Sequence, residues 1–213
     1  MAINGAPLWL IAMLKGGARK STTAMMLAFS LASKGEEVLV VDADHGTQGV
    51  TDWASKVYAR DSELPFDVVQ WSPRLGLLVP FIKTQQKETG AGRIIVDVGG
   101  EAPEVLRQIV IAADRVVSPV GPEEGELSRV AATQSIVGPT GAPMGLLLTR
   151  VPSPGVGRAK DARRDLTEDG FHVFTAEIPQ SRERYADVWG YVPADCGAYD
   201  QLTDELLRQE GDR

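Results

Sequence analysis

Charged and hydroxyl side chains follow a run of apolar residues near the start of the sequence. A Gly-Gly turn leads into Lys20 and Ser21, within a segment that runs from Leu14 to Thr22. Backbone N–H groups at a helix start attract anions, lysine neutralises phosphate, and a serine hydroxyl ligates Mg²⁺. The arrangement is typical of a loop that cradles nucleotide phosphates. The strict pattern Gly-x-x-x-x-Gly-Lys-Ser/Thr fails at Leu14 and Arg19, so a glycine turn before a capped helix remains an alternative for this segment alone.

Aspartates end two further apolar runs. Asp42 and Asp44 come directly after residues 38–41, and Asp97 follows residues 94–96. Carboxylates beside a buried strand are costly unless they meet a cation or hydrogen-bond donors. One aspartate alone is explained by a helix cap, but three beside a Lys-Ser loop indicate a site for a nucleotide with Mg²⁺.

The elements that must position these residues alternate between apolar runs and amphipathic segments. Strands are predicted at 8–14, 38–41, 66–69, 94–98, 115–120, 144–149 and 172–175. Helices are predicted at 20–34, 47–60, 75–88, 102–112, 124–137, 157–168 and 198–209. Nearly continuous apolar strands alternating with helices predict a doubly wound, mostly parallel sheet flanked by helices. We expect residues 1–213 to form a single α/β domain whose ligands lie at the carboxyl ends of the strands.

Composition narrows the class of protein. The 213 residues are 43% hydrophobic and 24% charged, which excludes a disordered or fibrous chain. No apolar run approaches the roughly 18 residues of a membrane span, and Cys196 is the single cysteine, so we expect a cytoplasmic protein without an internal disulfide. The net charge of −7 argues against a protein that coats nucleic acid, yet residues 150–164 are locally basic.

Taken together, the motifs resemble those of the ParA/MinD family of ATPases. Its deviant Walker A box is similar to Lys15-Gly16-Gly17-x-x-Lys20-Ser21-Thr22, its second box to Asp42-Ala43-Asp44-x-x-x-Gln48, and its Walker B aspartate to Asp97. The family's Ile-Pro-Arg element resembles Ile178-Pro179-Gln180, and its final helix resembles residues 198–207. Trp53, residues 147–150 and the short length point to the small ParF-like plasmid-partition ATPases. The resemblance implies a P-loop NTPase fold.

The resemblance also implies roles for individual residues. Lys15 would reach across a sandwich dimer to the partner's phosphates, Lys20 would act in cis, and Asp44 would position the attacking water; these three are the catalytic residues. Ser21 would bind Mg²⁺, with Asp42 and Asp97 holding its waters. The ATP-binding set comprises Gly16, Gly17, Ala18, Arg19, Lys20, Ser21 and Thr22 at the phosphates, with Thr149, Arg150 and Pro179 around the adenine.

As a partition ATPase, the protein would dimerise with ATP and Mg²⁺ and bind DNA without sequence preference, in association with the nucleoid. A centromere-bound, ParB-type partner would stimulate hydrolysis and release DNA, and no membrane would be involved, because the C-terminal helix is acidic. Two basic sets are candidates for the DNA contact: Arg182 and Arg184, and the set Arg158, Lys160, Arg163 and Arg164. A solvated helix face with intrahelical acidic partners is the alternative interpretation.

Three departures from the family pattern affect the expected function. Arg19 replaces a glycine, His45 replaces a proline, and Gly99-Gly100 replaces a Pro-Pro pair. We expect the Arg19 side chain to point outward and the substitution to weaken ATP binding; the alternative is a guanidinium that contacts phosphate or the partner. Two other functions stay open: a ligase of the dethiobiotin-synthetase-like type and a nucleotide-binding scaffold that has lost hydrolysis.

Overall fold

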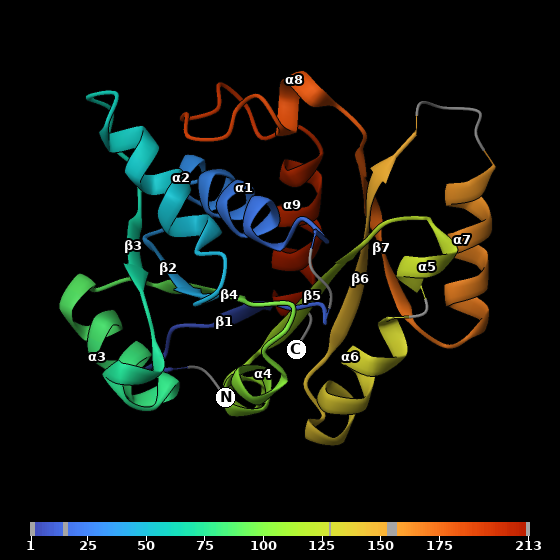
Figure 1. Ribbon diagram of the computed structural model, residues 1–213, viewed down its shortest axis with the longest axis horizontal. Coiled ribbons are helices and arrows are strands. Elements are labelled where there is room, and N and C mark those ends of the chain that lie inside the picture. The colour runs from blue at the N-terminus through green and yellow to red at the C-terminus, as the bar shows by residue number, and fades with distance from the viewer. Residues whose placement is uncertain (1–2, 15–16, 128, 153–156, 212–213) are drawn as a thin grey trace.

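A seven-stranded parallel sheet forms the centre of the computed structural model, which describes residues 3–14, 17–127, 129–152 and 157–211 (Figure 1). The strand order is β3-β2-β4-β1-β5-β6-β7. The strands are β1 (Leu8–Ile11), β2 (Val38–Ala43), β3 (Asp67–Gln70), β4 (Arg93–Val98), β5 (Arg115–Val120), β6 (Met144–Val151) and β7 (His172–Pro179). The predicted α/β fold with a doubly wound parallel sheet is confirmed.

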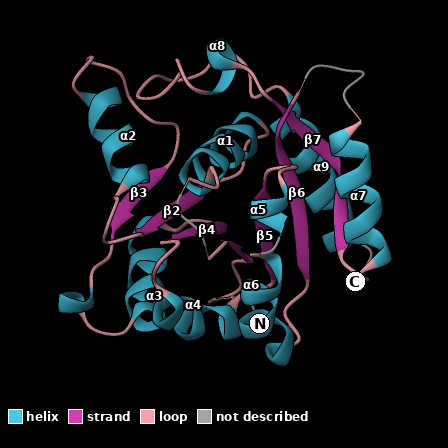
Figure 2. Ribbon diagram, turned by 45° about the vertical axis from the view of Figure 1, so that its right-hand side comes forward, coloured by secondary structure: helices cyan, strands magenta, loops and turns pink. Residues whose placement is uncertain are grey.

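Helices cover both faces of the sheet, as Figures 1 and 2 show. On one face lie α1 (Lys20–Ser33), α2 (Gly49–Tyr58) and α9 (Ala198–Gly211), and on the other lie α3 (Leu78–Thr89), α4 (Pro103–Ile109) and α6 (Val130–Val137). Alternate residues of β1 serve the two cores: Trp9 packs toward α1, whereas Leu10 packs toward α4. Both residues are fully buried, which explains why this strand reads as continuously apolar.

Short elements complete the chain. They are α5 (Glu124–Leu127), α7 (Arg158–Glu168), α8 (Arg182–Tyr185) and the 3₁₀ turns Pro73–Leu75, Val110–Ala112 and Gly138–Thr140. Helix α7 packs against β6 and β7 through Ala162 and Leu166. The helix predicted over 124–137 is described as α5 and α6, and the first strand ends at Ile11 instead of residue 14. Helix α8 was not predicted, because a single turn is too short to produce a hydrophobic period.

The strand order places the predicted site residues together. Strand β4 lies between β1 and β2, and Asp42 of β2 is paired in register with Asp97 of β4. Asp97 is also the register partner of Ile11 at the end of β1. The loop before α1 and the two aspartates therefore meet at one edge of the sheet, where parallel α/β folds bind ligands.

Candidate functional site

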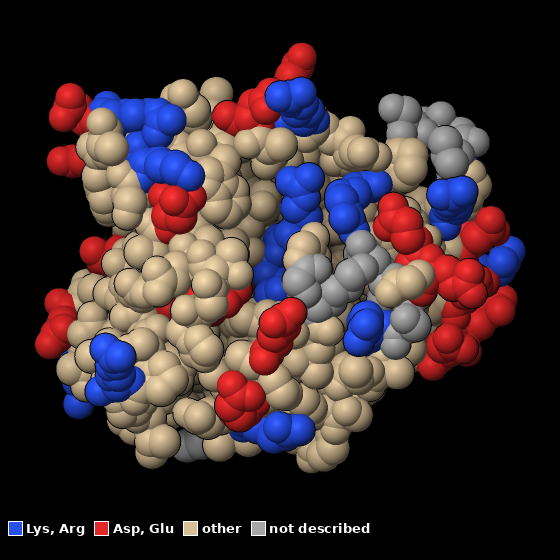
Figure 3. Space-filling model, in the orientation of Figure 1, with Lys and Arg blue, Asp and Glu red and all other residues tan. Residues whose placement is uncertain are grey.

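A cleft of about 690 Å³ opens at the carboxyl ends of β1, β2 and β4. Three loops line it, over residues 17–22, 44–47 and 99–102, together with Tyr185, Ala186 and Trp189 from the C-terminal part of the chain. In Figure 3, Lys and Arg side chains gather around the hollow at the centre of the molecule, whereas acidic side chains gather toward the side that carries α7. The cleft is therefore suited to an anionic ligand.

The N-terminus of α1 faces this cleft without a capping side chain. Arg19 is the N-cap residue but makes no side-chain cap bond, and the first turn of α1 contains no acidic residue. Lys20, the first helical residue, is 7% exposed. Burial lowers the pKa of Lys20, while the charges of Asp97 and Asp44 act in the opposite direction. The helix N–H groups and the lysine ammonium provide a site for phosphate.

The half-buried Ser21 and the fully buried Asp97 form a pair beside Lys20. The Ser21 hydroxyl donates a hydrogen bond of 2.6 Å to Oδ2 of Asp97. The other oxygen, Oδ1, is buried and has no hydrogen-bond partner in the described part of the chain. Burial raises the pKa of Asp97 to about 7; the Ser21 hydrogen bond opposes this shift, and the nearby carboxylate of Asp42 adds to it. An unpartnered carboxylate oxygen next to a serine hydroxyl fits a hydrated Mg²⁺ ion.

Asp42 accepts hydrogen bonds that the sequence did not predict. Its Oδ2 accepts hydrogen bonds of 2.8 Å from both the backbone N–H and the hydroxyl of Thr51, and its Oδ1 accepts one of 3.1 Å from the Asp44 N–H. Burial raises the pKa of Asp42, and these donors oppose the shift. Sequence reasoning missed Thr51, because nothing in its local pattern marks a partner nine positions away.

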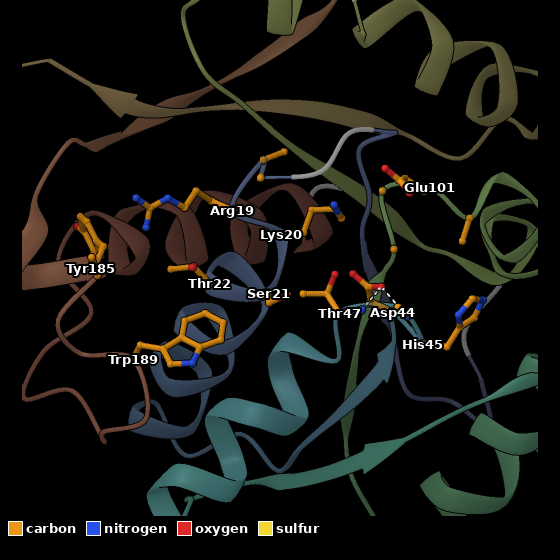
Figure 4. Close-up of a pocket in the computed structure, with 17 residues that line it drawn as sticks. Arg19, Lys20, Ser21, Thr22, Asp44, His45, Thr47, Glu101, Tyr185 and Trp189 are labelled. Atoms are coloured by element: carbon orange, nitrogen blue, oxygen red, sulfur yellow. Dashed lines mark hydrogen bonds between the residues drawn. The ribbon is translucent and has the colours of Figure 1, made fainter.

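Asp44 lines the cleft itself. Its Oδ1 accepts hydrogen bonds from the N–H groups of Gly46, at 3.2 Å, and Thr47, at 3.1 Å (Figure 4). A Cβ atom on Gly99 would lie 2.8 Å from the same oxygen, so glycine at that position leaves room for the carboxylate. Within the described residues, no three His, Cys, Asp or Glu side chains converge as a metal site.

A second cavity, of about 160 Å³, adjoins the cleft. It brings together the three residues predicted around adenine: Thr149, Arg150 and Pro179. The Thr149 hydroxyl is buried without a hydrogen-bond partner among the described residues, and it is available to a ligand. Tyr185 and Tyr199 also line this cavity, with their rings edge to face at 5.5 Å. Neither tyrosine was predicted to line the site, because neither belongs to the phosphate-binding or metal-binding motifs.

Arg19 differs from the expected orientation. Its side chain is half-buried and lines both cavities instead of pointing outward. Figure 4 shows it extending away from Lys20 toward Tyr185. The backbone of Arg19 is left-handed, with φ 63° and ψ 27°, a conformation that glycine adopts without steric cost. Lys15 and Gly16, the predicted lysine in trans and its neighbour, lie outside the described residues.

The two basic sets occupy separate elements. On α8, Arg182 is 87% exposed and pairs with Asp187 at 3.2 Å, and Arg184 pairs with Asp195. On α7, Arg163 pairs with Glu177 of β7 at 2.7 Å. The remaining members of the α7 set are exposed, namely Arg158, Lys160 and Arg164.

Arg164 fits a solvated helix face. It has acidic neighbours on its own helix at Asp161, Asp165 and Glu168. Arg182 instead lines the second cavity at the edge of the site, so the α8 set is the one next to the cleft.

No helix in the described ranges is long and apolar enough to cross a membrane.

Comparison with known proteins agrees with this geometry. Residues 9–187 match the family model described as the CobQ/CobB/MinD/ParA nucleotide binding domain. A relative from Gloeobacter kilaueensis, "Maintenance of carboxysome distribution protein A", is 36% identical over 167 residues, which cover 77% of this chain and 72% of that protein. "Protein ParA" of Rhizobium radiobacter is 32% identical over 118 residues, covering 55% of this chain and 50% of that protein.

Solved structures show the same fold. A plasmid partition protein from Borrelia burgdorferi, bound to AMPPNP, has a TM-score of 0.75 at 16% identity and covers 96% of this chain and 99% of its own. Apo McdA from Cyanothece has a TM-score of 0.75 at 16% identity, with 94% and 99% covered. Cobyrinic acid a,c-diamide synthase from Mycobacterium smegmatis, with ADP and magnesium, has a TM-score of 0.68 at 19% identity, with 98% and 97% covered.

Proposed function

Because the chain belongs to the CobQ/CobB/MinD/ParA family of nucleotide-binding domains, we propose that it is a ParA-type ATPase for DNA partition. One observation carries the proposal. Lys20 and the Ser21–Asp97 pair, with its unpartnered oxygen, lie at one end of the site, and the cavity around Thr149 lies at the other. The residues that would bind phosphate and metal are thus separated from the cavity that would hold the base, as a nucleotide with Mg²⁺ requires.

Each of the residues in the cleft has its own role in phosphoryl transfer. Lys20 and the N–H groups of α1 neutralise the phosphates, and Ser21 and Asp97 hold Mg²⁺ and its waters. The metal, when bound, neutralises charge that develops on the transferred phosphoryl group. Asp44 orients the attacking water, and its bonds to the Gly46 and Thr47 N–H groups fix the carboxylate for that task. Asp42, tied to Thr51, positions the start of α2 against the metal site.

Dimerisation and DNA binding complete the proposal. Lys15 acts on the partner's phosphates, so an ATP-dependent sandwich dimer is part of catalysis. The dimer binds DNA without sequence preference through Arg182 and Arg184, with the α7 set as the second candidate. A ParB-type partner bound to a centromere stimulates hydrolysis, which releases the DNA. The dimer associates with the nucleoid.

ATP hydrolysis, measured by phosphate release with and without non-specific DNA, tests this function. We expect weak hydrolysis that requires Mg²⁺, rises with DNA and partner, and is lost in Lys20→Ala. Hydrolysis that DNA leaves unchanged and that a small-molecule acceptor stimulates would favour a ligase of the dethiobiotin-synthetase-like type. Tight ATP binding without turnover under any condition would favour a scaffold that has lost hydrolysis.

A further inference from the structure

Arg19 has a backbone conformation that its residue type disfavours. With φ 63° and ψ 27° it is left-handed, where a Cβ atom crowds the following carbonyl oxygen. The Arg19 side chain does not stabilise α1 as a cap, because it makes no capping hydrogen bond to that helix. A strained non-glycine residue at a ligand site indicates that its side chain contributes to function.

The side chain lies at the junction of the two cavities. Arg19, Thr22, Tyr185 and Ala186 line both of them, whereas Lys20 lines the cleft alone. Thr22 stands three positions after Arg19, at the start of the same helix. Figure 4 shows the guanidinium directed toward Tyr185, on the side of the cleft opposite to Asp44. Arg19 and Tyr199 both line the second cavity, and the guanidinium charge slightly lowers the pKa of Tyr199 against the larger, opposite effect of burial.

The order of the chemical groups along a nucleotide indicates which of them lies at this junction. Under the proposed function, the terminal phosphates bind beside Lys20 and Ser21, and the base binds beside Thr149. The group between them is the phosphate attached to the ribose. We propose that Arg19 binds this α-phosphate in cis, an assignment that rests on the proposed function. A guanidinium suits the task, because its planar set of donors forms paired, charge-assisted bonds to phosphate oxygens.

This role predicts a distinctive pattern of affinities. The α-phosphate is common to ADP and ATP, so loss of the guanidinium should weaken both nucleotides by the same factor. A cation that served the terminal phosphate, in cis or from a partner subunit, would affect the triphosphate far more than the diphosphate. A residue that contributed only backbone strain would weaken neither nucleotide when replaced by glycine.

Isothermal titration calorimetry of Arg19→Gly with Mg-ADP and with a non-hydrolysable Mg-ATP analogue separates these cases. We expect Kd to rise about tenfold to a hundredfold for both ligands, as for loss of a bond to a charged group. The melting temperature of the ligand-free variant should rise by about 2–4 °C, because glycine relieves the left-handed strain. That rise shows that the weaker binding is not a folding defect.

Asp61→Gly is the matched control. Asp61 has a similar left-handed backbone, with φ 54°, and it lines neither cavity. This variant should gain thermal stability and leave both Kd values unchanged. Unchanged or tighter binding by Arg19→Gly overturns the inference, and so does a loss confined to the ATP analogue. If the unmodified protein binds neither nucleotide, the proposed function itself fails; normal binding that Arg19→Gly leaves intact removes the α-phosphate assignment alone.

Discussion

The Ser21 hydroxyl donates a hydrogen bond of 2.6 Å to Asp97, which joins the first turn of α1 to the end of β4. Gly49, the first residue of α2, packs directly against Ser21, and a Cβ atom there would lie 2.5 Å from the Ser21 Oγ. The three elements thus meet at one hydroxyl group. The space around that hydroxyl is the feature that a substitution at Gly49 would disturb.

Gly49→Ala should displace Ser21 and weaken nucleotide binding that depends on Mg²⁺. We expect a loss of about tenfold to a hundredfold, typical when the support of a metal ligand is removed. Calorimetry with and without Mg²⁺ measures the effect, and the loss should largely vanish when chelator is present. Gly92→Ala is the control, since the nearest atom to its added Cβ is 3.9 Å away. Normal Mg-nucleotide affinity in Gly49→Ala would show that Ser21 does not take part.

Asp44→Ala should separate hydrolysis from binding. Removal of a group that positions water should slow turnover by about 10²–10⁴, while nucleotide affinity stays within a few-fold of normal. The variant should accumulate as an ATP-bound, DNA-bound dimer, which light scattering and DNA retention detect. His45→Ala, the next residue along the cleft, should hydrolyse ATP normally. Outright loss of ATP binding in Asp44→Ala would assign Asp44 to the metal ligands.

The ligand-free protein should lose stability as the pH rises toward 7. The pKa of Asp97 is about 7 in the folded chain and about 4 in an unfolded one, so between these values only the folded state holds the proton. The contribution of Asp97 is therefore complete below about pH 4 and is lost as pH rises through about 7. In chelator, the melting temperature of Asp97→Asn should exceed that of the unmodified protein more at pH 8 than at pH 5. Parallel profiles would contradict this.

DNA binding should depend on salt through Arg182. A dimer that contacts about four phosphates through Arg182 and Arg184 should give a log–log salt slope of roughly −3 to −4. Arg182→Ala should reduce its magnitude by about two units per dimer, equally for all sequences. The exposed pair with Asp187 costs little to break. Arg164→Ala on α7 should leave the slope unchanged; the reverse result would move the DNA site to α7.

Lys15→Ala should abolish ATP-dependent dimerisation and leave a folded monomer that binds nucleotide. Lys20 already supplies the cation in cis, and a cation supplied in trans is worth on the order of 10³–10⁵ in rate. Light scattering with a non-hydrolysable analogue measures dimerisation, and phosphate release measures turnover. A variant that dimerises normally would show that Lys15 is not the residue that acts in trans.

The sequence by itself determined the strands, and it predicted the chemistry at their ends. Runs such as residues 94–96 are apolar at every position. This pattern is typical of a strand that is buried on both faces, so the sheet could be predicted from the local sequence. Asp97 was identified as a site residue for the same local reason, because a carboxylate ends that run. The loop at Lys20 and Ser21 could be predicted in the same way, because consecutive residues at one helix N-terminus can form a phosphate site.

Tertiary structure alone decided what surrounds those residues. Thr51 satisfies Asp42 from α2, and Trp189 and Tyr199 reach the site from the far end of the chain. Such contacts depend on how the helices pack on the sheet. The hydrophobic periodicity within one segment does not specify that packing. The left-handed backbone of Arg19 carries its side chain to the junction of two cavities, whereas the expectation from the sequence was that it would point outward. Sequence spacing specifies which groups are present, whereas packing specifies which atoms they meet.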